Sequence, residues 1–244
     1  MSKRRLLSLC LLLELCLICS IAVAAMFSGP RFALFYHGLY GLGFSFALPL
    51  LYMHKEGAGL ASAGVAGMGK KQWIVLAAFV LFSIGGQLLP LMLNGSVIQW
   101  GLLKRGFFPL VMTTFFEEFL FRGFFQTRFE KAFGWPLALL LSAMMFSLYH
   151  LGYPGFRTPQ DILLLFAVGL GFAAAFKLSG NNLLVAYFVN LPNAFVTYIL
   201  KSAQFPPFDR SAIIFSAFTA LLIAIVLFFV KKNFTAALNE DGRP

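Results

Sequence analysis

The side chains of this sequence that could do chemistry begin with two adjacent glutamates in an apolar segment, Glu117 and Glu118, with Arg122 four residues after the second. A charged side chain at the centre of a bilayer costs about 2.5–3.5 kcal/mol on insertion scales, so such a cluster indicates a functional site. On a helix, Glu118 and Arg122 project about 40° apart and can pair, whereas Glu117 projects about 140° away from Arg122. The spacing therefore predicts one neutralised ion pair and one free carboxylate, Glu117.

A carboxylate, an imidazole and an amide in a dry cavity can together hydrolyse a bond. The carboxylate takes a proton from water, the imidazole shares the proton or orients the water, and the amide donates to the developing oxyanion. The apolar segments offer His150, Asn190 and Asn193 for these parts. Each residue also has a structural interpretation: an ion pair can lock helices, an asparagine can hydrogen-bond across them, and a histidine at a helix end can be interfacial.

The composition predicts a membrane protein. The chain has 244 residues, of which 60% are hydrophobic and 11% charged, whereas soluble domains are about 45–50% apolar and about 25% charged. We expect an all-α fold, a polytopic helical bundle with about eight transmembrane helices. The phenylalanines crowd these segments, which suits lipid-facing surfaces. The expected spans are Leu6–Met26, Phe32–Met53, Trp73–Leu93, Phe107–Phe125, Trp135–His150, Ile162–Leu178, Leu183–Leu200 and Ile213–Val230.

The distribution of Lys and Arg predicts the orientation in the cell membrane. With alternating spans and a cytoplasmic N-terminus, most of these residues fall on the cytoplasmic side, so both termini are expected inside the cell. Lys104 and Arg105 fit this arrangement poorly. The net charge of +10 is explained by orientation and by anionic lipid headgroups, and no nucleic-acid partner is expected.

The expected organisation has three parts: N-terminal transmembrane helices in residues 1–100, a catalytic helical core in residues 101–205, and a last helix with a cytoplasmic tail in residues 206–244. The Gly- and Ala-rich stretch 56–69 predicts a flexible cytoplasmic loop. The first span could instead be a signal peptide, although its length and Glu14 favour a retained helix. Glu14 has no assigned role.

Two motifs resemble those of a known family. Glu117-Glu118-x-x-x-Arg122, followed by Phe146-x-x-x-His150, resembles the first two motifs of the CPBP intramembrane proteases. These comprise the CAAX prenyl endopeptidases and the bacteriocin-processing or immunity proteins, also called Abi. The resemblance covers about residues 105–200, including a loop at residues 179–183. The family's third motif is His-x-x-x-Asn, which places Val189 at the histidine position and Asn193 at the asparagine position.

The resemblance implies roles for these residues. In the family, the glutamate and the first histidine activate water, and the second histidine and the asparagine stabilise the oxyanion. By resemblance, Glu117 and His150 activate water, Asn193 keeps part of the oxyanion site, and Glu118 with Arg122 supports it. Loss of one oxyanion donor costs about 100–1000-fold in rate, so reduced activity is expected unless Asn190 or Tyr187 supplies a replacement.

The resemblance implies a substrate that is a membrane-anchored protein or peptide, such as a leader peptide, a sorting tail or a CAAX-like tail. The alternative is a non-catalytic protein on the same scaffold, acting in bacteriocin immunity or as a partner of a transporter or sensor. No cofactor is expected. A catalytic zinc ion takes three protein ligands, and the sequence has three histidines in all and no His-Glu-x-x-His motif. We therefore expect metal-free, glutamate-dependent hydrolysis.

Overall fold

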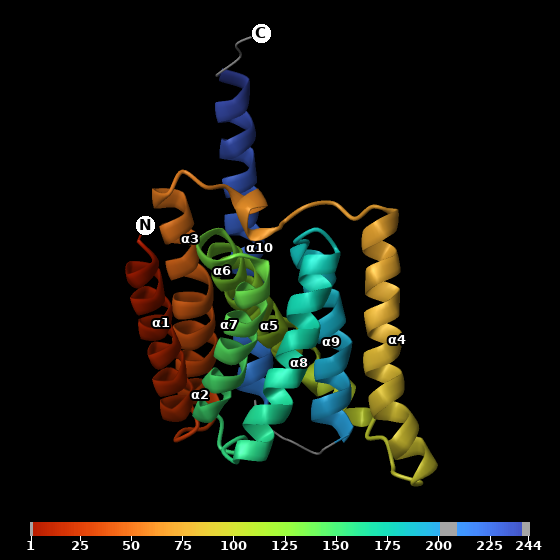
Figure 1. The fold of residues 1–244 in the computed structure, drawn as a ribbon. Coiled ribbons are helices and arrows are strands. Elements are labelled where there is room, and N and C mark those ends of the chain that lie inside the picture. Colours follow the sequence, from red (N-terminus) through yellow and green to blue (C-terminus); the bar gives the residue numbers. More distant parts are fainter. Residues whose placement is uncertain (1, 201–208, 241–244) are drawn as a thin grey trace.

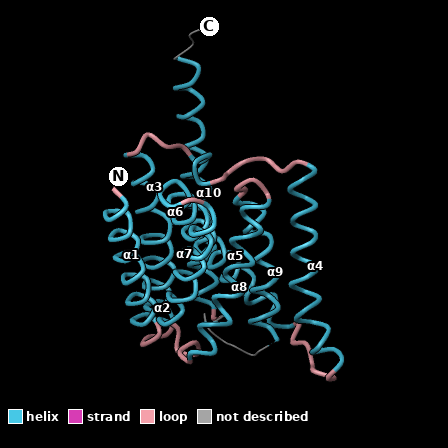
Figure 2. The backbone as a smooth tube through the Cα atoms, in the orientation of Figure 1, coloured by secondary structure: helices cyan, strands magenta, loops and turns pink. Residues whose placement is uncertain are grey.

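Apolar helices standing side by side make up the molecule (Figure 1). The computed structural model describes residues 2–200 and 209–240, and within these ranges there are helices and loops but no strand (Figure 2). The helical segments are α1 (Lys3–Ala24), α2 (Gly29–Ala33), η1 (Leu34–Ala47), α3 (Leu48–Lys55), η2 (Leu60–Ala63), α4 (Lys70–Leu93), α5 (Gly101–Glu118), η3 (Phe119–Gln126), α6 (Thr127–Phe133), α7 (Trp135–Leu148), η4 (Tyr149–Gly152), α8 (Pro159–Leu178), α9 (Leu183–Leu200) and α10 (Arg210–Glu240).

The predicted all-α membrane bundle is confirmed. Among the described residues, six helical stretches are long and apolar enough to cross a bilayer: Lys3–Ala24, Gly29–Lys55, Lys70–Leu93, Trp135–Gly152, Pro159–Leu178 and Arg210–Phe228. The second of these runs without a break through α2, η1 and α3. The other two expected spans correspond to α5 with η3, which carries the charge cluster, and to the shorter apolar helix α9. The division of the chain into three parts stays a prediction.

The start of α1 and the end of α10 lie at the same end of the bundle (Figure 1). This arrangement requires an even number of crossings between them, in agreement with the eight expected spans. Which end faces the cytoplasm stays a prediction from the distribution of Lys and Arg.

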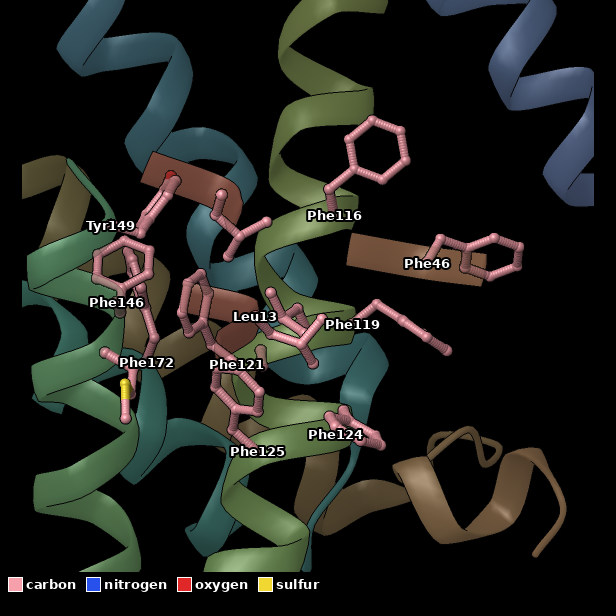
Figure 3. Close-up of a cluster of buried hydrophobic side chains, with 14 of the residues drawn as sticks. Leu13, Phe46, Phe116, Phe119, Phe121, Phe124, Phe125, Phe146, Tyr149 and Phe172 are labelled. Carbon is pink, nitrogen blue, oxygen red and sulfur yellow. The ribbon is translucent and has the colours of Figure 1, made fainter. Parts of the chain in front are cut away.

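Phenylalanine rings from α5 and η3 form much of the core, so the expectation that phenylalanines mainly face lipid is wrong for this segment. Phe121 points toward α7, where its ring centroid lies 5.6 Å from that of Phe146, and Phe119 points the other way toward Phe46 of η1, 5.0 Å between centroids (Figure 3). The rings of Phe119 and Phe121 on η3 and of Phe46 on η1 are almost fully buried. Aromatic burial on both sides fixes this central segment between its neighbours.

Two stretches, η1 and η3, are π-helical, a wider helix that occurs frequently at functional sites. η1 approaches α5 closely at Gly41, where a Cβ atom would lie 2.0 Å from the ring of Phe116. A glycine is therefore required there. The close approach brings Tyr40, the neighbour of Gly41, against the turn of α5 that carries Glu117, with 6.1 Å between the Tyr40 and Phe116 ring centroids.

The expected flexible loop after α3 is instead docked on the bundle. The amide of Leu183 donates to the carbonyl of Gly64 at 2.8 Å, and the side chain of Asn182 donates to the carbonyl of Gly67 at 3.0 Å. Gly64 has a φ of 80°, and a Cβ there would lie 2.1 Å from the Asn181 carbonyl oxygen. The prediction of a flexible loop fails because the stretch is hydrogen-bonded to the start of α9, and Gly64 permits a backbone contact too close for any side chain.

Candidate active site

Glu117 lies at the end of α5 and is only 5% exposed. Its two carboxylate oxygens are held by different helices. The hydroxyl of Tyr149, at the start of η4, donates to Oε1, and the Nδ2 amide of Asn190 in α9 donates to Oε2 at 2.9 Å. A buried carboxylate with a donor on each oxygen is fixed in position and still has a free lone pair on each oxygen for a further hydrogen bond.

The predicted ion pair between Glu118 and Arg122 is confirmed. Glu118 Oε2 lies 3.3 Å from Arg122 Nε, and both side chains are almost fully buried. Arg122 also donates to the hydroxyl of Ser142 in α7 at 2.7 Å and lies 5.1 Å from the centre of the Phe146 ring. The guanidinium thus lies between its own helix and α7. Its positive charge compensates the carboxylate of Glu118, one of the two adjacent glutamates.

His150 is buried beside the carboxylate site, and its ring centroid lies 4.2 Å from that of Tyr149. Its Nδ1 atom lies 2.7 Å from the carbonyl oxygen of Phe146. A carbonyl oxygen can only accept, so Nδ1 carries the proton, and in the neutral ring Nε2 is left with a lone pair that can accept one. No hydrogen bond joins His150 to Glu117 within the described part of the chain; Tyr149 contacts both.

The two asparagines of α9 have different partners. Asn190 bridges the carboxylates, because its Nδ2 atom also lies 2.9 Å from Glu118 Oε1. Asn193 turns toward α4, where its Oδ1 atom accepts from Gln87 Nε2 at 2.6 Å and from Ser83 at 3.2 Å. The structure therefore brings Asn190 to Glu117 and places Asn193 in the seam between α4 and α9. The oxyanion role of Asn193 stays a prediction.

The other two α9 positions named from the sequence do not supply a donor. Val189 is buried at 2% exposure and has no polar group. The hydroxyl of Tyr187 donates to the carbonyl of Val111 at 3.4 Å. The third-motif position that would carry the second histidine therefore has no hydrogen-bond donor. The hydroxyl of Tyr187 does not replace it, because it binds the carbonyl of Val111.

A group of buried tyrosines around Glu117 was missed by the sequence analysis. Tyr36, Tyr40, Tyr149 and Tyr198 all lie within electrostatic range of its carboxylate. Their signal in the sequence was weak, because tyrosines near the ends of apolar segments are typical of interfacial belts. Only Tyr149, next to His150, had a position that could have drawn attention to it.

The site is closed in this structure. A cavity of about 700 Å³ lies at the turn between α1 and α2, lined by residues such as Phe27 and Arg31. A second, of about 370 Å³, lies at the other end of the bundle, between Ser62, Glu130 and Asn181. Glu117 lines neither of these two cavities and is only 5% exposed, so a substrate that reaches it requires a rearrangement of the helices around it.

The residues around Glu117 do not fit a zinc site. Among the residues that the structure describes, no three His, Cys, Asp or Glu side chains are grouped so that they could hold a metal ion. A catalytic zinc ion takes three such protein ligands. The nearby ligand atoms are those of His150 and of two carboxylates, of which Glu118 is paired with Arg122.

Comparison with known proteins relates this site to a family. No curated protein and no solved structure matched the chain. A family model did match, over residues 99–196, which run from α5 through most of α9. Every site residue discussed above except the tyrosines of η1 and Tyr198 falls in this segment, and the family points to a peptidase of the CAAX type acting in the membrane. Residues 99–196 match the family described as Type II CAAX prenyl endopeptidase Rce1-like, and the predicted resemblance to the CPBP family is thereby confirmed.

Proposed function

We propose that this protein is an intramembrane endopeptidase in which Glu117 and His150 activate water to hydrolyse a peptide bond. The observation that supports this most is the environment of Glu117. Its carboxylate is buried and fixed by Tyr149 and Asn190, while the neighbouring Glu118 is compensated by Arg122. A protein that needed only this buried ion pair would have no use for the second buried carboxylate, whose burial costs free energy.

In the proposed reaction, a water oxygen attacks the carbonyl carbon of the scissile peptide bond. Glu117 takes one proton from the water, with the unprotonated Nε2 of His150 orienting it or sharing that proton. The resulting tetrahedral intermediate carries an oxyanion that needs a hydrogen-bond donor. When the carbon–nitrogen bond breaks, the proton returns from Glu117 to the leaving amine, so the products are a carboxylic acid, which then loses its proton to solvent, and an amine. No metal ion or other cofactor takes part.

The proposed substrate is a protein or peptide held at the membrane, with a leader, a sorting tail or a CAAX-like tail as its cleaved part. The lipid bilayer is the other partner, because apolar side chains cover much of the outer surface. α4 is the extreme case: none of its residues is buried, and Trp73, Leu81 and Phe82 are each more than half exposed. We place the protein in the cell membrane as a multipass protein with both termini in the cytoplasm.

A non-catalytic role on the same scaffold is the second candidate, in bacteriocin immunity or as a partner of a transporter or sensor. Two observations favour it. Val189 stands where the family has a histidine, and Glu117 is enclosed with both oxygens hydrogen-bonded. In this role the carboxylates would fix the helices, and no substrate would need to reach them.

One experiment separates the two candidate functions. It measures the cleavage of co-expressed membrane-tethered substrates by variants in which a buried acid or a buried histidine is replaced. Glu117→Gln and His150→Ala should each lower cleavage by about 100-fold or more. The matched controls are Glu14→Gln and His37→Ala, whose side chains are also buried and have no hydrogen-bond partner among the described residues. Wild-type cleavage by both test variants, in folded protein, would exclude the protease. Protection from a peptide toxin that survives both substitutions would support the immunity role.

A further inference from the structure

The oxyanion half of the proposed site lacks an evident donor. The third-motif histidine is replaced by Val189, which is apolar and buried. Asn190 is next to it, but an amide NH₂ group has two protons, and Asn190 uses Nδ2 for both Glu117 and Glu118 at 2.9 Å each. It therefore positions the carboxylates and has no proton left to donate to a tetrahedral intermediate.

Buried phenols are among the other donors near Glu117, and three of them are engaged. The hydroxyl of Tyr149 donates to Glu117 itself. The hydroxyls of Tyr36 and Tyr153 are 2.8 Å apart and hydrogen-bond with each other. Each of these three phenols thus already has a partner in the closed site.

Tyr40 is different. Its side chain is 1% exposed, and within the described residues its hydroxyl makes no hydrogen bond of acceptable geometry, although the hydroxyls of Tyr149 and Tyr153 are its neighbours. Its ring is nearly parallel to that of Tyr149, with 6.2 Å between centroids and 10° between planes. The hydroxyl also lies within electrostatic range of Glu117. A buried hydroxyl without a partner is unfavourable for folding, so its retention calls for another explanation.

The backbone around Tyr40 is built to bring it to this place. The following residue, Gly41, allows η1 to approach the ring of Phe116, where any Cβ would collide at 2.0 Å. Phe116 directly precedes Glu117 in α5. The close approach thus sets the unpartnered phenol beside the turn that carries the proposed base.

We propose that the hydroxyl of Tyr40 is the hydrogen-bond donor that stabilises the oxyanion, in place of the missing third-motif histidine. This inference rests on the proposed function. Tyr40 keeps its proton throughout; it donates a hydrogen bond to the oxygen that becomes negative, while Glu117 carries the proton taken from water. Because the Tyr40 hydroxyl makes no hydrogen bond of acceptable geometry in this structure, it gives up no such bond when it donates to the intermediate, and a donor in a buried, water-excluded site stabilises a developing oxyanion strongly.

The test is Tyr40→Phe, which keeps the ring and removes only the hydroxyl. With a membrane-tethered reporter that the wild-type protein cleaves, kcat should fall about 100–1000-fold, and KM should change little, because the oxyanion exists only after binding. The thermal unfolding temperature in detergent should stay the same or rise, since the Tyr40 hydroxyl makes no hydrogen bond of acceptable geometry among the described residues. The matched control is Tyr187→Phe, whose hydroxyl bonds to the Val111 carbonyl and which should keep wild-type kcat.

The outcomes separate this inference from the proposed function. If Glu117→Gln abolishes cleavage while Tyr40→Phe retains wild-type kcat, the inference is wrong and the protease remains. If Glu117→Gln cleaves like the wild type, the proposed function fails and the role of Tyr40 with it. A loss of kcat in Tyr40→Phe that comes with a lower unfolding temperature, or that Tyr187→Phe shares, would indicate a packing effect and would also overturn the inference.

Discussion

The Nδ2 amide of Asn190 lies 2.9 Å from both Glu117 Oε2 and Glu118 Oε1, so a single side chain of α9 donates to two adjacent carboxylates of α5. This contact holds two like-charged groups side by side and connects the two helices that carry the site. Neighbouring carboxylates repel each other unless donors or cations compensate them. Asn190 and Arg122 together provide that compensation.

Asn190→Leu should therefore impair both folding and processing. Each carboxylate loses a donor, and an unsatisfied buried acceptor costs about 1–3 kcal/mol. We expect a lower unfolding temperature in detergent and a loss of reporter cleavage. Asn193→Leu is the comparison: its side chain bonds to α4, so it should retain cleavage. Equal losses of cleavage in the two variants would instead support the predicted oxyanion role of Asn193.

Arg122→Met should be strongly destabilising, because it leaves Glu118 buried and uncompensated. Breaking a buried ion pair in this way costs about 3–5 kcal/mol. The control is Arg128→Met: its partner Glu56 is 36% exposed, so the carboxylate left behind can be hydrated and the loss of stability should be smaller. Unfolding in detergent measures both. The double variant Glu118→Gln with Arg122→Met should be more stable than Arg122→Met alone; a double variant less stable than either would contradict the pairing.

Gln87→Leu should loosen α4 from α9. Gln87 donates to Asn193 at 2.6 Å and accepts from Thr197 at 3.1 Å, and hydrogen bonds between membrane helices are worth about 0.6–1.7 kcal/mol. A double-mutant cycle with Thr197→Val, read from unfolding in detergent, should give a coupling of this size. Additive effects would show that the contact contributes no stability.

Gly41→Ala should disturb both stability and activity. Its Cβ would lie 2.0 Å from the Phe116 ring, and overpacking of this kind costs about 1–3 kcal/mol. Because Tyr40 and Glu117 flank the collision, reporter cleavage should fall as well. Gly38→Ala, in the same segment, meets nothing closer than Leu34 at 3.7 Å and should be tolerated. Equal unfolding temperatures for the two variants would argue against the close approach.

Features set by local spacing or by composition could be predicted from the sequence. The apolar runs predicted the spanning helices, and the i to i+4 spacing predicted the Glu118–Arg122 pair. The partners of Glu117 could not be predicted in the same way. Whether Asn190 or Asn193 faces α5 depends on how α9 is rotated in the bundle, and the family spacing favoured Asn193. Tyr40 reaches the site through the contact of Gly41 with Phe116, which joins residues far apart in the chain.

The seam between α4 and α9 has a consequence for how the bilayer acts on this protein. α4 has no buried residue, so apart from its contacts with the bundle its surroundings are lipid. It is tied to α9 at Asn193, less than one helical turn from Asn190. A bilayer too thin or too thick for α4 tilts a helix of this kind. Any such tilt acts on the turn of α9 whose Asn190 donates to Glu117 and Glu118 in α5. We therefore expect the thickness of the membrane to affect the geometry of the site.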